Sequence, residues 1–170
     1  MDSKTERRIE WECQKVIHQF YHYVDHYEFE KAVLLFTEDI RWKVAGLDLT
    51  GRDELLSALH GGIGNDTIRH VITNTIVKVI DEDTADLWNY TSIYYSRQGR
   101  SDEVDGPLDF EGPHRFADGR ATMRHVGDQW QIAAREGGRL IFRRPNEPVA
   151  LDDWAKKEGK QQAVAINREE

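Results

Sequence analysis

The hydrophobic period of this chain changes near residue 37, and that change limits how the chain can fold. Residues 5–27 carry an apolar stripe at helical spacing, and a second helix is predicted at about residues 28–37. Beyond this point apolar and polar residues alternate, as is typical of strands. Helices followed by long strands indicate an α+β fold.

The elements predicted after residue 37 are a strand at 40–44, a turn bracketed by Gly46 and Gly51, a helix at 52–60 that ends at Gly61–Gly62, and strands at 67–80, 84–96, 110–126 and 129–142. The first helix needs a partner for its apolar stripe, and a curved sheet of long strands offers one. We expect the sheet to wrap around this helix as a cone and to leave an open-mouthed pocket for a small molecule.

Length and composition indicate one globular domain, and the net charge argues against two classes of binding partner. The 170 residues are enough for one domain with a core, and 39% hydrophobic and 32% charged residues indicate a globular chain. The net charge of −8 argues against nucleic acid and against an anionic membrane surface. No apolar run is long enough for a membrane span. We expect one domain at residues 1–144 and a polar extension at 145–170, with a short helix at about 151–157.

The cysteine content favours a reducing compartment. Cys13 is the only cysteine, so it has no partner for an intramolecular disulfide or for a cysteine-based zinc site. The first twelve residues are charged and lack the apolar core of a signal peptide. These features predict a cytoplasmic protein.

Two residues are candidates for acid–base chemistry. Asp25 lies at the edge of the apolar face of the first helix, where a carboxylate is costly unless it is paired. His70 shares a strand face with Ile68 and Ile72, and an imidazole, with an unperturbed pKa of about 6.5, suits proton transfer at neutral pH. Each residue also has an ordinary interpretation: Asp25 as a solvated or capping residue, and His70 as a hydrogen-bonded core residue.

A metal site and an aromatic pocket are further possibilities. His18 and His22 have the helical spacing of two ligands, and Asp25 could complete the set, but no zinc signature such as HExxH surrounds them. We therefore predict no metal and place these histidines at the rim of a pocket. The aromatic residues predicted to shape or polarise that pocket are Tyr21, Trp42, Tyr90 and Tyr95.

Four stretches together resemble a known family. They are YHYVDHYEFEKAVLLFTEDIRWKV (21–44), GRDELLSAL (51–59), TIRHVITNTIVKV (67–79) and GDQWQIAAREG (127–137). Their order and separations resemble the SnoaL-like, scytalone dehydratase-like proteins of the NTF2-like superfamily, across about residues 8–142. The resemblance implies an α+β cone with N-terminal helices packed in a curved, mainly antiparallel sheet.

The resemblance also implies roles for two residues. Lyases of this kind use an Asp–His dyad in which His removes a proton, and their two positions correspond to Asp25 and His70. Val24 and Tyr95 stand where scytalone dehydratase has a tyrosine and a second histidine. These departures argue against scytalone as the substrate.

Three functions remain open at this point. The first is a cofactor-independent lyase, most simply a dehydratase or a related isomerase or cyclase, acting on a small cyclic or polycyclic substrate. The second is an assembly subunit without catalysis, like the β subunits of ring-hydroxylating dioxygenases. The third is a ligand-binding NTF2-like protein with a vestigial dyad. A homo-dimer or homo-trimer is expected, because this fold commonly associates through its sheet face.

Overall fold

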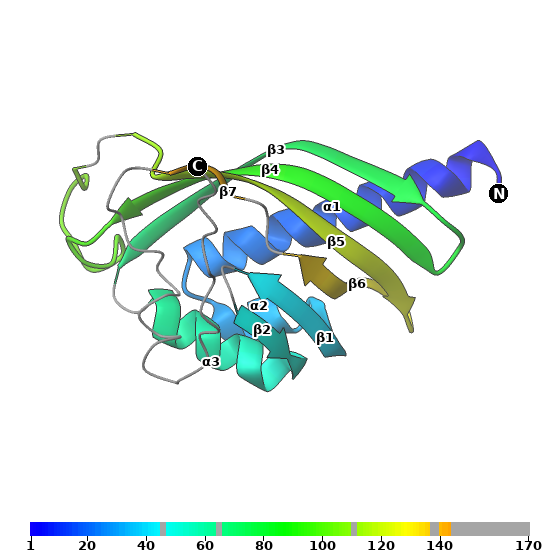
Figure 1. The fold of residues 1–170 in the computed structure, drawn as a ribbon, viewed down its shortest axis with the longest axis horizontal. Coiled ribbons are helices and arrows are strands. Elements are labelled where there is room, and N and C mark those ends of the chain that lie inside the picture. The colour runs from blue at the N-terminus through cyan, green and yellow to red at the C-terminus, as the bar shows by residue number, and fades with distance from the viewer. Residues whose placement is uncertain (45–46, 64–65, 110–111, 137–139, 144–170) are drawn as a thin grey trace, which may run out of the picture.

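A long N-terminal helix lies against the concave side of a curved sheet in the computed structural model, which describes residues 1–44, 47–63, 66–109, 112–136 and 140–143 (Figure 1). This helix, α1 (Ser3–Asp25), begins at Asp2, whose side chain accepts hydrogen bonds from the backbone of Lys4 and Thr5. Two shorter helices follow, α2 (Phe29–Val33) and α3 (Gly51–Ile63), and their ends differ from those predicted from the sequence. The α+β cone with N-terminal helices in a curved, mainly antiparallel sheet is confirmed.

The sheet is built mainly from antiparallel neighbours. Its strands are β1 (Phe36–Val44), β2 (Leu47–Thr50), β3 (Thr67–Val79), β4 (Thr84–Ser96), β5 (Arg115–Val126), β6 (Gln129–Glu136) and β7 (Leu140–Arg143). The strand order is β2-β1-β6-β5-β4-β3, and β7 pairs with β5 off this path. Only the β1–β6 pair is parallel among the described strands. The N-terminal and C-terminal parts of the domain therefore meet in the middle of the sheet.

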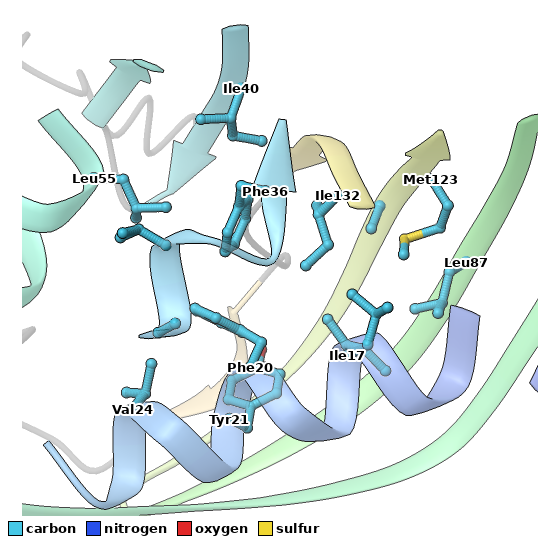
Figure 2. Close-up of a cluster of buried hydrophobic side chains, with 14 of the residues drawn as sticks. Ile17, Phe20, Tyr21, Val24, Phe36, Ile40, Leu55, Leu87, Met123 and Ile132 are labelled. Carbon is cyan, nitrogen blue, oxygen red and sulfur yellow. The ribbon is translucent and has the colours of Figure 1, made fainter. Parts of the chain in front are cut away.

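The core lies between α1 and the concave face. Figure 2 shows Ile17 and Phe20 pointing from α1 toward Leu87, Met123 and Ile132 on the strands. Phe20 is 1% exposed, and burying a side chain of this size stabilises the fold by about 1.5–3 kcal/mol. This packing fixes the rotation of α1, and it therefore fixes which side of α1 faces β3.

Several predicted boundaries were wrong. The second helix ends at Val33 because Phe36 already belongs to β1 and is fully buried. The stretch predicted as a turn between Gly46 and Gly51 contains β2, a strand too short for its alternation to be recognised. The third helix continues through Gly61–Gly62, since Gly62 and Ile63 are buried there.

The two C-terminal strand predictions also need correction. The strand predicted at 110–126 begins at Arg115. The strand predicted at 129–142 is two strands, since β6 ends at Glu136 and β7 pairs with the first residues of β5. The predicted extension at 145–170, with its helix at 151–157, lies outside the described residues. No helix in the described part of the chain is long and apolar enough to cross a membrane.

Candidate active site

Asp25 and His70 contact each other, although 44 residues separate them in the chain. The Nδ1 atom of His70 lies 2.6 Å from Oδ1 of Asp25, and the backbone N–H of His70 donates to Oδ2 at 2.8 Å. Both side chains are 9% exposed. An ionised carboxylate can only accept, so the shared proton belongs to Nδ1 and the neutral ring presents the lone pair of Nε2.

The end of α1 explains how Asp25 is held. Asp25 is the last residue of the helix, where a negative charge meets the negative end of the helix dipole. The two hydrogen bonds from His70 offset this cost. Arg69 adds a third restraint, because its Nη1 donates to the backbone oxygen of Asp25 at 2.7 Å and its Nη2 donates to Oγ of Ser101 at 2.7 Å. The position of the carboxylate is therefore determined by β3 and by the loop after β4.

A second polar group lies beside the dyad on the concave face. The ring of Tyr21 lies 4.7 Å from that of His70, centroid to centroid. The Tyr21 hydroxyl accepts a hydrogen bond from Nη2 of Arg135 and lies 3.4 Å from Oγ1 of Thr91. Asn89 donates to the same Thr91 oxygen at 2.8 Å. Tyr21 thus connects the dyad to a buried arginine on β6.

Arg135 is buried without a carboxylate partner. It is 3% exposed and makes no ion pair with any carboxylate in the described ranges. Its guanidinium carbon lies 5.3 Å from the ring centroid of Tyr21 and 5.8 Å from that of Trp42. Room for the guanidinium comes from Gly119, where an added Cβ would lie 3.3 Å from Nη2.

The four aromatic residues predicted for the pocket do not all lie at the dyad. Tyr21 lies beside His70, and Trp42 lies beside Arg135 with its ring stacked on Phe36 at 5.9 Å. Tyr90 lies on the opposite face of the sheet, is 39% exposed and contacts Phe116. We therefore leave Tyr90 out of the proposed site, because alternation along β4 turns it outward.

Tyr95 lies on the concave face but is bound to a neighbouring group. Its hydroxyl donates to Asp66, and its backbone N–H donates to Nδ1 of His114 at 3.1 Å. Burial, together with the hydrogen bond to Asp66, raises the pKa of the Tyr95 phenol. Tyr95 thus forms part of the wall beyond Ile68, its partner on β3, and its hydroxyl is already occupied.

The predicted rim histidines lie on the solvent face of α1. His18 and His22 line a groove of about 450 Å³ together with Trp11, Gln14, Lys15 and Gln19. This groove shares no residue with the dyad, and the carboxylate of Asp25 faces His70 instead. No group of three His, Cys, Asp or Glu side chains in the described residues could hold a metal ion. We place the candidate site at the dyad because paired, buried ionisable groups are found there.

Sequence reasoning missed Arg135, Asn89 and Gly119. Asn89 could have been found, since it continues the inward alternation of Ala85 and Leu87 along β4. Arg135 could not, because strict alternation from Trp130 turns it outward. A β-bulge places Ile132 and Ala133 both in the core, so that the following residues change face and Arg135 points inward.

Cys13 is not a candidate nucleophile. It is fully buried on the core-facing side of α1, and burial raises the pKa of its thiol to about 12. The reactive thiolate is therefore disfavoured at neutral pH.

The curved sheet and the enclosed first helix give this chain the fold of proteins described as NTF2-like with a cystatin-like fold. The chain belongs to the SnoaL-like domain family, whose model matches residues 5–136. This family includes dehydratases and isomerases. The comparison with curated proteins gives no match.

Solved structures share the fold at low sequence identity. A protein of Novosphingobium aromaticivorans, provisionally named a scytalone dehydratase, is 17% identical with a TM-score of 0.72, over 86% of this chain and 93% of its own. A protein of unknown function from Mycobacterium tuberculosis is 19% identical with a TM-score of 0.74, over 96% of this chain and 98% of its own. An NTF2-like protein of N. aromaticivorans is 22% identical with a TM-score of 0.61, over 82% of this chain and 84% of its own. At these identities the comparison shows the fold alone.

Proposed function

We propose that this protein is a lyase, a dehydratase that needs no cofactor and acts on a small cyclic or polycyclic substrate. The observation that carries the proposal is the contact of 2.6 Å between Nδ1 of His70 and Oδ1 of Asp25. It orients the imidazole so that Nε2 is the free base, and it supports the positive charge that the ring gains on taking a proton.

The proposed reaction begins with proton removal next to a carbonyl. Nε2 of His70 takes the proton, and the electron pair of the C–H bond forms an enolate. When the enolate collapses, the carbon–oxygen bond to the neighbouring hydroxyl breaks, and the protonated His70 returns its proton to the departing oxygen. The products are the unsaturated carbonyl compound and water, and the imidazole is neutral again. An isomerase or cyclase would share the first step.

The experiment compares the wild-type protein with Asp25→Asn and His70→Gln. Hydroxy-ketones and polycyclic phenols are screened for loss of water by mass spectrometry, and rates are measured on any substrate found. Each variant should lose about 10²–10⁴-fold in rate, the usual contribution of general acid–base catalysis. His22→Gln is the matched control, because His22 is an exposed histidine on α1, the helix that carries Asp25. Retention of near-full activity by either dyad variant would refute the proposal.

A chelator provides an independent arm of the same experiment. We propose that activity survives treatment with EDTA, since the dyad itself supplies both the base and the group that orients it. Loss of activity on chelation, restored by a divalent metal, would instead favour a metal site that includes His18 and His22.

The two alternative functions predict different results. An assembly subunit would bind a partner protein tightly and show no turnover, and a ligand-binding protein would bind substrates that it does not convert. A neighbour of N. aromaticivorans with a TM-score of 0.63 and 16% identity is provisionally described as an aromatic ring hydroxylase, which keeps the first alternative relevant. The expected homo-dimer or homo-trimer remains a proposal, which light scattering after gel filtration would test.

A further inference from the structure

The buried guanidinium of Arg135 has hydrogen-bonding capacity that the protein does not use. Its Nη2 donates to the Tyr21 hydroxyl, but Nε and Nη1 are buried and have no partner in the described part of the chain. A buried arginine stays charged, since a guanidinium does not lose its proton in proteins. A buried charge without a counterion is strongly destabilising, so this position is costly in the free protein.

The groups around Arg135 do not neutralise it. Its neighbours include the hydroxyl of Tyr21, the ring of Trp42 and, on the Gly119 side, the neutral Oδ1 of Asn89, a buried acceptor that also has no partner. Trp42 adds another buried donor without a partner, its Nε1. The carboxylate of Asp25 is engaged on both oxygens by His70. The three unpartnered nitrogen atoms of Arg135 and Trp42 therefore form a buried, donor-rich and positively charged cluster beside the ring of Tyr21.

We infer that Arg135 binds a carboxylate of the substrate, so that the substrate is a cyclic or aromatic carboxylic acid. A carboxylate supplies the negative charge that this cluster lacks and acceptor atoms for its free donors, and the rings of Tyr21 and Trp42 suit a planar apolar body beside it. A neutral carbonyl oxygen could accept hydrogen bonds from these donors but would leave the charge uncompensated. The full, permanent charge of Arg135 in the free protein therefore favours an anion already present in the ground state.

This inference rests on the proposed function only in treating the bound acid as substrate, so its test measures binding without turnover. Calorimetry on the full chain compares benzoate with benzamide, its neutral isostere. The wild-type protein should prefer benzoate by at least about tenfold, as expected for charged hydrogen bonds. Arg135→Gln should abolish the preference, and Arg135→Lys should restore part of it. Arg120→Gln is the matched control, because Arg120 is an exposed arginine paired with Asp86.

Two further variants distinguish a failure of this inference from misfolding of Arg135→Gln and from a failure of the catalytic proposal. Gly119→Ala crowds the guanidinium and should weaken benzoate binding even if Arg135→Gln does not fold. His70→Gln should keep the preference for benzoate, so a failure of the catalytic proposal leaves the binding result intact. A wild-type protein that binds both compounds alike, or neither, overturns the inference, as does a preference for benzoate that survives in Arg135→Gln.

Discussion

Asp25 and Arg135 are both buried ionisable residues, yet their hydrogen bonding differs. Tyr21 links them, since its hydroxyl accepts from Arg135 and its ring contacts His70, the partner of Asp25. Asp25 accepts hydrogen bonds on both carboxylate oxygens from one residue, His70. Arg135 donates to one hydroxyl and leaves Nε and Nη1 without a partner. The chain therefore completes the first group by itself, while the second is complete only when something binds to it.

This difference suggests that the two groups have separate roles in one site: Asp25 orients a base, and Arg135 recognises a charge. A base must be oriented before the substrate arrives, because its position sets the geometry of proton transfer. A group that recognises charge gains selectivity from being unpaired, since only an anion removes the cost of its burial. Binding sites of this kind trade stability for function, and the comparison can be tested by measuring stability at each group.

The largest effect on stability is expected at Asp25. Asp25→Ala removes the acceptor for the buried N–H groups of His70, so the free energy of unfolding should fall by about 3 kcal/mol. Urea denaturation followed by circular dichroism measures this change. Asp39→Ala is the control, because Asp39 is an exposed carboxylate and its loss should cost less than about 0.5 kcal/mol. Equal effects of the two variants would show that the dyad does not stabilise the fold.

Replacement of Arg135 is expected to raise the free energy of unfolding, whereas replacement of Asp25 lowers it. Arg135→Met replaces a buried charge without a counterion by an apolar side chain of similar length, so the free energy of unfolding should rise by about 1 kcal/mol. The gain is limited because the bond to Tyr21 and the contacts with two rings are lost. The same denaturation experiment measures it. A decrease of about 2 kcal/mol or more would mean that the protein already compensates this charge, and the contrast with Asp25 would disappear.

The smallest effect is expected on the outer face of the sheet. Tyr90→Ala removes a ring that is 39% exposed and contacts Phe116 at 5.4 Å, so stability should fall by only about 0.5 kcal/mol. Benzoate binding and any turnover should stay within about twofold of the wild type. A large loss of binding would return Tyr90 to the site and would show that the outer face contributes to it.

The sequence predicted the dyad better than its surroundings. The hydrophobic period alone left Asp25 and His70 with ordinary structural interpretations, and the two were paired because their positions match those of a family. Tyr90 and Tyr95 were grouped together from composition, although five residues along one strand turn the two rings to opposite faces. Boundaries such as the start of β7 depend on pairing with β5, which local pattern does not contain.

The sequence by itself determined the order of the three helices and the long strands, the α+β class and the place of Asp25 at the edge of the apolar face of α1. These follow from hydrophobic period, which is a local property. Only the tertiary structure decided that Arg135 faces Tyr21. The bulge that places Ile132 and Ala133 both in the core lies where β6 pairs with β5, and it is a property of strand pairing that the local pattern of β6 does not contain. That bulge turns an arginine expected on the surface toward the core, beside the dyad.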